Sequence, residues 1–274
     1  MRVPSPRLPS TLPPLYGWTV LSLRPRGQHG GLRAAAARAG ARVLALSPQA
    51  IVARHDDATR QALEDALASD FVLFTSPNAV RAAAALASLH PRRGQAWLAV
   101  GSGTRRALQR LGIAAQAPAR MDSEGLLALP ALAAVRGHAV GLVTAPGGRD
   151  RLAPALAARG AQVQRADVYA RVPVALGARQ RAALAAALAH PQQVLLALSS
   201  GEALAALLAQ VDDPRLRTVA VAAASARLAE VARTAGFTRV AVAAGTLPAD
   251  LLRAWPLAPH GGSSCKPRLH PDAG

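Results

Sequence analysis

The feature that most constrains the fold is an internal repeat. Residues 30–52, GGLRAAAARAGARVLALSPQAIV, resemble residues 150–172, DRLAPALAARGAQVQRADVYARV. Further along the chain, residues 71–80, FVLFTSPNAV, resemble residues 194–204, VLLALSSGEAL. Because turns and closing glycines recur at matched distances, the pattern favours two structurally similar halves. The alternative is a chance similarity among alanine-rich amphipathic helices.

Within each half, short apolar runs alternate with alanine-rich stretches of helical spacing. Several runs are apolar without alternation, which is typical of strands buried on both faces of a parallel sheet. This alternation predicts an α/β fold with right-handed crossovers. The expected strands are Trp18–Leu23, Arg42–Leu46, Phe71–Phe74, Ala96–Val100, Ala139–Val143, Gln162–Val168, Val194–Leu198, Thr218–Ala222 and Arg239–Val242.

Two segments at equivalent places in the repeat look like extended connectors rather than turns. They are SPQAIVARHDD at 47–57 and DVYARVPVALG at 167–177. If the two connectors run side by side between lobes, the middle of the chain is an inserted lobe. We therefore expect residues 17–50 and 170–256 to form one lobe. Residues 54–168 would then form the other.

The two ends of the chain differ from this pattern. Residues 1–16 contain five prolines, and residues 257–274 are rich in Pro, Gly, Ser and His. Both are expected to be disordered. The head has no continuous apolar stretch, so we expect no signal peptide. The chain has no 18-residue apolar run, so no membrane span is expected either, and a cytoplasmic location fits.

The charge balance bears on the class of ligand. The net charge is +17, and Lys266 is the only lysine among 32 basic residues. Arginine forks match carboxylates and phosphates, which favours a polyanionic ligand. A general preference for arginine and alanine is the alternative, because the arginines are scattered along helices. Nucleic acid is a weaker candidate, because aromatic residues make up only 3% of the chain.

Conventional catalytic and metal-binding motifs are missing from the sequence. The single cysteine, Cys265, permits neither an internal disulfide nor a cysteine metal site. The histidines are not spaced as metal ligands, and no nucleotide-binding or GxSxG motif occurs. These absences count against hydrolases and metalloenzymes, and they give no support to nucleotide binding. An enzyme with this sequence would depend on positioning more than on a strong acid or base.

The turns after several expected strands are candidate binding segments. Ser76 stands at a helix N-cap position, with Pro77 at the first helical position. In parallel sheets, ligands bind beyond the carboxyl ends of strands, against helix N-termini. The alternative is that these residues only make a well-capped helix start. The structural and the binding interpretations are compatible. Equivalent turns lie at 101–104, 144–150 and 199–202.

Taken in order, these motifs resemble the uroporphyrinogen-III synthase family. The matching stretches are VLSLRPR, FTSPNAV, AVGSGT, SEGLL, PGGRDRLAPALAARGAQVQRADVYARV, LSSGEAL and TLPADLL, which cover about 18–255. The resemblance implies two α/β lobes joined by a two-stranded connector, with the active site in the cleft between them. It also implies a monomeric, cofactor-free lyase. Such an enzyme cyclises hydroxymethylbilane, which carries eight carboxylates, with inversion of ring D and loss of water.

The resemblance also suggests site residues. Tyr169, in DVYARV, matches the family's tyrosine and could donate a proton to the departing hydroxyl. The alternative is an aromatic side chain that packs the lobe junction. The residues expected to bind substrate are Arg24, Ser76, Asn78, Gly101, Thr104, Ser123, Gly148, Arg149, Ser199, Ser200 and Ser225.

One turn departs from the family pattern. Ser225 replaces a glycine, and Leu228 stands where the family often has a threonine. Two other functions remain open: a non-catalytic two-lobed protein that binds a polyanion, and a nucleic-acid-binding protein.

Overall fold

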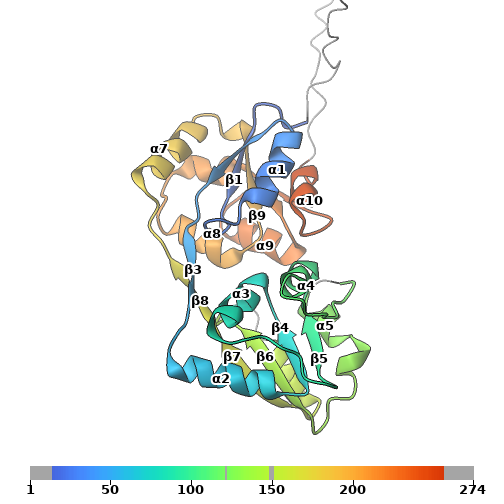
Figure 1. Ribbon diagram of the computed structural model, residues 1–274. Coiled ribbons are helices and arrows are strands. Elements are labelled where there is room, and N and C mark those ends of the chain that lie inside the picture. The colour runs from blue at the N-terminus through green and yellow to red at the C-terminus, as the bar shows by residue number, and fades with distance from the viewer. Residues whose placement is uncertain (1–13, 121, 148–150, 256–274) are drawn as a thin grey trace, which may run out of the picture. The chain divides into compact units, whose positions relative to one another are not determined.

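The computed structural model describes residues 14–120, 122–147 and 151–255 (Figure 1). The chain divides into two compact units. Unit 1 contains the described residues up to Pro48 and those from Val174 onward, and unit 2 is Gln49–Pro173. Unit 2 is therefore inserted in the sequence of unit 1. Both units are α/β, with a parallel sheet flanked by helices, as predicted.

Unit 1 contains a five-stranded sheet in the order β11-β10-β9-β1-β2, with every neighbouring pair parallel. The strands are β1 (Thr19–Ser22), β2 (Arg42–Ala45), β9 (Val194–Leu198), β10 (Ala220–Ala223) and β11 (Arg239–Val242). The helices are α1 (Gly30–Arg38), α7 (Ala178–Ala187), α8 (Gly201–Leu208), α9 (Ala226–Thr234) and α10 (Pro248–Arg253). Short 3₁₀ turns cover Pro191–Gln193 and Pro214–Thr218.

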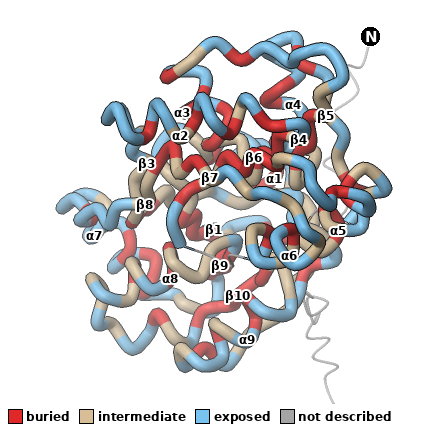
Figure 2. Tube along the Cα trace, turned by 90° about the horizontal axis from the view of Figure 1, so that it is seen from below, coloured by how far each residue is buried: buried red, intermediate tan, exposed pale blue. Residues whose placement is uncertain are grey.

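The sheet of unit 1 is covered on both faces. Apolar side chains of α7, α8 and α9 pack with Leu21, Leu196 and Val221 in one core. Those of α1 and α10 pack with Val20 and Leu195 in the other. Because neighbouring residues of a strand point to opposite faces, a sheet buried on both sides needs continuous apolar runs. Figure 2 shows these strands buried beneath helices whose outer faces are exposed.

Unit 2 contains a four-stranded parallel sheet in the order β5-β4-β6-β7. Its strands are β4 (Phe71–Phe74), β5 (Ala96–Ala99), β6 (Ala139–Thr144) and β7 (Gln162–Asp167). Its helices are α2 (Asp57–Ala68), α3 (Pro77–Leu86), α4 (Ser102–Gln109), α5 (Ser123–Leu127) and α6 (Leu152–Ala158), with a 3₁₀ turn at Pro130–Leu132. Helices α2, α3 and α4 pack in one core, and α5 and α6 in the other.

The two extended connectors form strands β3 (Gln49–Ala53) and β8 (Tyr169–Pro173). They pair antiparallel, with Gln49 opposite Pro173 and Ala53 opposite Tyr169. The two-stranded connector expected from the sequence is therefore confirmed. The repeat also accounts for the sheets, because the order β5-β4-β6-β7 in unit 2 corresponds to β10-β9-β1-β2 in unit 1. Strand β11 is an additional edge strand.

Capping residues and glycines explain where several helices begin and end. The Ser76 hydroxyl accepts a hydrogen bond from the Ala79 N–H at 3.0 Å, which caps α3. Gly112 and Gly236 follow α4 and α9 with φ of +77° and +90°, a conformation that favours glycine. Gly141 in β6 is needed for a different reason, because the backbone of α2 approaches it closely. A Cβ atom there would lie 1.9 Å from the Ala66 carbonyl oxygen of α2.

All nine strands expected from apolar runs occur, each within two residues of its expected ends. The start of the chain differs from expectation, because the ordered structure begins before residue 17. Leu15 is 1% exposed in the core beside α1, and its N–H donates to the Ala39 carbonyl at 2.7 Å. The remainder of the expected disordered head and the tail at 257–274 lie outside the described residues.

Candidate active site

The predicted binding turns lie at the carboxyl edges of the two sheets. In unit 2, Ser76 follows β4 and Gly101 follows β5, while Ser123 begins α5. In unit 1, Arg24 follows β1, Ser199 and Ser200 follow β9, and Ser225 follows β10. Because all strands of each sheet are parallel, the turns of each unit share one edge. Free N–H groups of helix N-termini point outward there and can bind anions.

A polar pocket of about 170 Å³ opens at the carboxyl edge of unit 2. Thr75 and Thr144 meet in its wall through a hydroxyl hydrogen bond of 2.8 Å. Its polar lining consists of Thr75, Ser76, Ser123, Thr144, Arg165 and Arg171. The sequence interpretation missed both arginines. They lie within β7 and β8 and follow no recognisable turn motif, so no local sequence signal marked them.

Tyr169 does not line this pocket itself, but its hydroxyl contacts two residues that do. The ring is 1% exposed and packs in the core of α2, α3 and α4. Its hydroxyl lies 3.0 Å from the Ser76 hydroxyl and 3.2 Å from Nη2 of Arg171, which donates to it. The Arg171 guanidinium carbon also lies 5.5 Å from the ring centroid. The ring is thus a packing element, and both partners of its hydroxyl line the pocket.

The structure does not bring every predicted residue of unit 2 to this pocket. Thr104 is 2% exposed and faces the core with Ala107 and Leu108 on the buried side of α4. The Asn78 side chain accepts a hydrogen bond from Arg81 one turn along α3. Neither residue lines the pocket. Gly148 and Arg149 lie outside the described residues.

In unit 1 the notable group is the half-buried guanidinium of Arg24. Burial lowers its pKa from the ordinary value, although it remains a cation at neutral pH. Within the described part of the chain it has no hydrogen-bond or ion-pair partner. A partly desolvated cation without a counter-charge favours binding of an anion. Ser200 and Ser225 nearby in the fold cap α8 and α9.

His29 is a second feature of this edge, and the sequence interpretation missed it. The ring is 4% exposed, and its Nδ1 lies 2.9 Å from the Ser22 hydroxyl. Its Nε2 lies 2.8 Å from the Ser47 hydroxyl, which donates to the Arg24 carbonyl at 2.9 Å. Burial, followed by the nearby Arg33 and Arg24, lowers the pKa of His29. The spacing of positions 22, 29 and 47 carries no recognisable signal.

The lowered pKa of His29 predicts acid sensitivity. The folded protein holds the ring neutral, whereas the unfolded chain protonates it near the ordinary value of 6.5. The unfolded state therefore binds more protons below that pH, and stability is lost as the pH falls. We expect the urea midpoint to fall between pH 7.5 and pH 5, and His29→Gln to reduce this fall. His190→Gln, at an exposed histidine of the same unit, should retain it.

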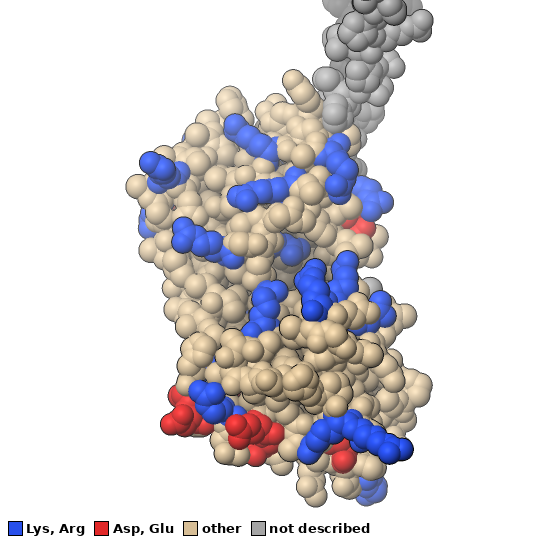
Figure 3. All heavy atoms as spheres, in the orientation of Figure 1, with Lys and Arg blue, Asp and Glu red and all other residues tan. Residues whose placement is uncertain are grey.

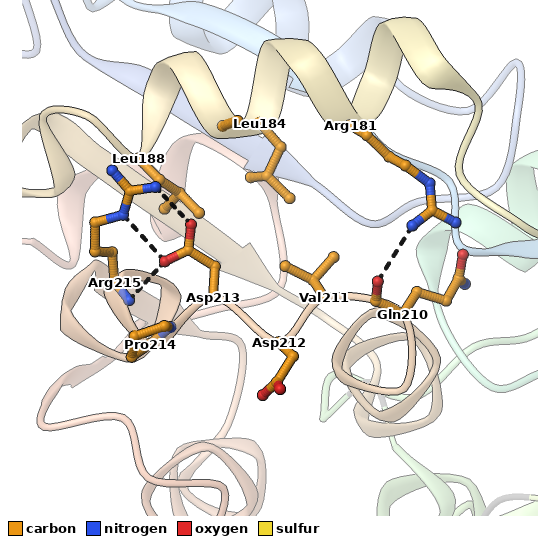
Figure 4. A pocket seen from close by; sticks show the side chains of 10 residues that line it. Arg181, Leu184, Leu188, Gln210, Val211, Asp212, Asp213, Pro214 and Arg215 are labelled. Atoms are coloured by element: carbon orange, nitrogen blue, oxygen red, sulfur yellow. Dashed lines mark hydrogen bonds and ion pairs between the residues drawn. The ribbon is translucent and has the colours of Figure 1, made fainter.

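A larger cavity of about 620 Å³ lies in unit 1 between α7 and the 210–215 loop (Figure 4). It contains none of the predicted site residues, and its floor is apolar, with Leu184, Leu188 and Val211. Asp213 is paired with Arg215 at 2.8 Å, and Arg181 donates to the Gln210 carbonyl at 3.4 Å. The side chains of Arg181, Gln210, Asp213 and Arg215 are thus already engaged in hydrogen bonds and ion pairs within unit 1.

The distribution of surface charge and of possible metal ligands does not define a further site. On the face shown in Figure 3, basic side chains are spread over both units, and most of the acidic ones lie in the lower part of unit 2. Across the described residues, no three or more His, Cys, Asp or Glu side chains are grouped as metal ligands would be.

Comparison with known families decides between the remaining interpretations. A family model described as Uroporphyrinogen-III synthase HemD matches residues 31–253. The chain belongs to the uroporphyrinogen-III synthase family. The resemblance first suggested by the ordered motifs is therefore confirmed, and with it membership of a family of hydro-lyases in tetrapyrrole biosynthesis.

Solved structures agree with the uroporphyrinogen-III synthase fold. A mutant uroporphyrinogen III synthase from the extremely thermophilic bacterium Thermus thermophilus is 23% identical, with a TM-score of 0.58 over 86% of this chain and 96% of that one. The uroporphyrinogen-III synthetase from Helicobacter pylori is 13% identical, with the same TM-score and the same coverage of both chains. No curated protein gives a significant match.

Ser76 both caps α3 and contacts the Tyr169 hydroxyl, and the free energy of unfolding measures what the two contacts contribute. Ser76→Ala removes the cap of α3 and one hydrogen-bond partner of Tyr169, so we expect a loss of about 0.5–2 kcal/mol. Ser200→Ala is the matched control, because Ser200 caps α8 at 3.2 Å from the Ala203 nitrogen without a tyrosine partner. Urea denaturation of both variants should show the larger loss for Ser76→Ala. Equal losses would mean that the bond to Tyr169 contributes nothing.

Proposed function

We propose that this protein is a uroporphyrinogen-III synthase that cyclises hydroxymethylbilane with inversion of ring D and loss of water. The observation that carries the proposal is the family match over 31–253. The reaction removes the terminal hydroxyl with a proton as water, attacks a substituted pyrrole carbon to form a spiro intermediate, and then rearranges. Uncatalysed closure gives the symmetric isomer, so the enzyme selects a transition state by geometry.

The carboxyl edges supply the kind of contacts that a polycarboxylate needs. Each edge presents helix N-termini, whose N–H groups attract carboxylates through their partial positive charge. In the proposal, Arg24 of unit 1 and the pocket with Arg165 and Arg171 in unit 2 bind substrate carboxylates. The serines that cap α3, α8 and α9 hold these N-termini in place.

Tyr169 is the proposed proton donor to the departing hydroxyl. The Arg171 guanidinium donates to the Tyr169 oxygen at 3.2 Å, and a positive charge there stabilises the phenolate left after proton transfer. Ser76 at 3.0 Å can donate a hydrogen bond to this phenolate. We further infer that the enzyme is a monomer in the cytoplasm and works without a cofactor. None of the helices in the described ranges is long and apolar enough to cross a membrane.

The test is a coupled assay that starts from porphobilinogen and hydroxymethylbilane synthase. Products are oxidised and separated by chromatography, and the ratio of isomer III to isomer I is measured with and without this protein. Isomer III should dominate in its presence. If only isomer I forms while the bilane is bound and its closure is slowed, the protein is a polyanion-binding protein instead.

Arg24→Ala tests the binding role proposed for unit 1. A hydrogen bond to a charged group is worth about 1.5–3 kcal/mol, so KM should rise by about 10–100-fold with little change in kcat. Arg26→Ala is the matched control, because Arg26 is exposed two residues further along the same turn. If the two variants have the same KM, Arg24 does not bind the substrate.

A further inference from the structure

The hydrogen bonds of His29 form a closed chain around the end of β1. Ser22 is the last residue of β1, and Arg24 lies two residues later. The Ser22 hydroxyl contacts His29, His29 contacts Ser47, and the Ser47 hydroxyl donates back to the Arg24 carbonyl. Side chains from β1, the N-terminus of α1 and the segment after β2 are thereby tied together.

The direction of these hydrogen bonds follows from counting protons. Ser47 has one hydroxyl proton, and it is donated to the Arg24 carbonyl at 2.9 Å. Ser47 must therefore accept from His29, so Nε2 of His29 carries a proton. A neutral ring then has an unprotonated Nδ1, which accepts from the Ser22 hydroxyl at 2.9 Å. The network specifies one tautomer of a neutral histidine.

Ser47 is held in an unusual backbone conformation by this network. Among the described residues it is the only non-glycine with positive φ, at 46°. Serine adopts this left-handed region infrequently, and the surrounding structure must stabilise it there. Ser47 directly precedes Pro48 and β3, the first crossing from unit 1 to unit 2. His29 is the side chain that contacts the Ser47 hydroxyl.

We propose that His29 is a positioning residue for anion binding by Arg24. Through Ser47 it fixes the Arg24 backbone, so that the unpartnered guanidinium is preformed at the carboxyl edge of unit 1. This rests on the proposed function in one respect, that Arg24 contacts the substrate. His29 itself contacts no reacting atom and lies beneath the surface.

Two substitutions separate the two hydrogen bonds of the His29 ring, one to Ser22 and one to Ser47. The amide of His29→Asn reaches about as far as Nδ1 of the histidine ring. It therefore keeps the hydrogen bond with Ser22 and loses the one with Ser47. The amide of His29→Gln reaches about as far as Nε2 and can still donate to Ser47. A neutral hydrogen bond accounts for about a 2–10-fold effect, so His29→Asn and Ser47→Ala should raise KM by that factor, with kcat unchanged. His29→Gln should stay close to wild type.

Measuring the effect of His29→Asn on KM both in the wild type and in the Arg24→Ala variant distinguishes a positioning role from a general structural one. If His29 acts through Arg24, His29→Asn should leave KM unchanged in that background. If His29 only supports the fold, His29→Asn should lower the urea midpoint and shift KM equally in both backgrounds, which would overturn the proposal. ¹⁵N NMR of the wild type at pH 7.5 should also show the neutral Nε2–H tautomer, and an averaged ring would overturn it.

A binding measurement keeps this proposal apart from the proposed function. Equilibrium dialysis with uroporphyrin III, a stable octacarboxylate, should show a higher Kd for His29→Asn than for His29→Gln. A protein that makes no isomer III but shows this difference would remove the proposed function and keep the positioning role. If the protein is active but its KM and Kd do not change in His29→Asn, the proposed function stands and the positioning role is removed. If the wild type neither reacts nor binds, both fail.

Discussion

Tyr169→Ala is expected to lower the free energy of unfolding by about 3–5 kcal/mol, the usual cost of removing a buried aromatic ring. The ring is almost fully buried in the core that contains side chains of α2, α3 and α4 and the stacked pair Phe74 and Trp97. Its loss leaves a cavity in a core that can collapse only partly. It also leaves Arg171 and Ser76 without their shared partner. Urea denaturation followed by circular dichroism measures the effect.

Tyr169→Phe is the matched variant, because it keeps the ring and removes only the hydroxyl. Its stability should change by about 0.5–1.5 kcal/mol, the net value of a hydrogen bond. If the hydroxyl is the proton donor, kcat should fall by about 10²-fold or less, since general acid catalysis contributes about 10²–10⁴-fold and this leaving step is easy. Isomer III should still dominate. Wild-type turnover would remove the catalytic role and leave the packing role.

Gly141→Ala is expected to cost about 3 kcal/mol or more, at the upper end of overpacking effects. The added methyl would lie 1.9 Å from the Ala66 carbonyl oxygen, and backbone atoms cannot rotate away as a flexible side chain can. Either β6 or the end of α2 must then shift. Because β6 is a central strand that pairs with β4 and β7, the whole sheet of unit 2 would be disturbed.

Gly103→Ala provides the control for this prediction. Gly103 lies in α4, where an added Cβ would make an ordinary contact of 3.5 Å with Pro77. Alanine favours helix over glycine, so stability should rise by about 0.5–1 kcal/mol. Thermal denaturation of the two variants should therefore shift in opposite directions. Equal shifts would show that the close approach at Gly141 relaxes at little cost.

The strands and the connector could be predicted from sequence because their causes are local. A strand buried on both faces requires a continuous apolar run such as Val194–Leu198, and Ser76 before Pro77 signals a helix start. The repeat then indicated which segments correspond. These features depend on residues close together in the chain, so they can be recognised in a single sequence.

The site was harder to predict because its contacts join distant positions. Ser76 and Tyr169 are 93 positions apart, and Gln180 reaches back 134 positions to the Leu46 carbonyl. Thr104 was expected to bind substrate because of its place in a glycine turn, but its helical phase is that of Ala107 and Leu108, which face the core. His29 gave no signal because its partners meet only once β1 and β2 pair.

The strand order of unit 1 has a consequence for synthesis on the ribosome. Strand β1 pairs with β2 on one side and with β9 on the other. After β2 emerges, about 150 further residues must be made before β9 appears, which takes about 8–30 s at 5–20 residues per second. Unit 2 is contiguous and can fold within that interval. The N-terminal βαβ segment of unit 1 therefore waits with an exposed apolar edge, and it is the part of the nascent chain that most needs chaperone protection.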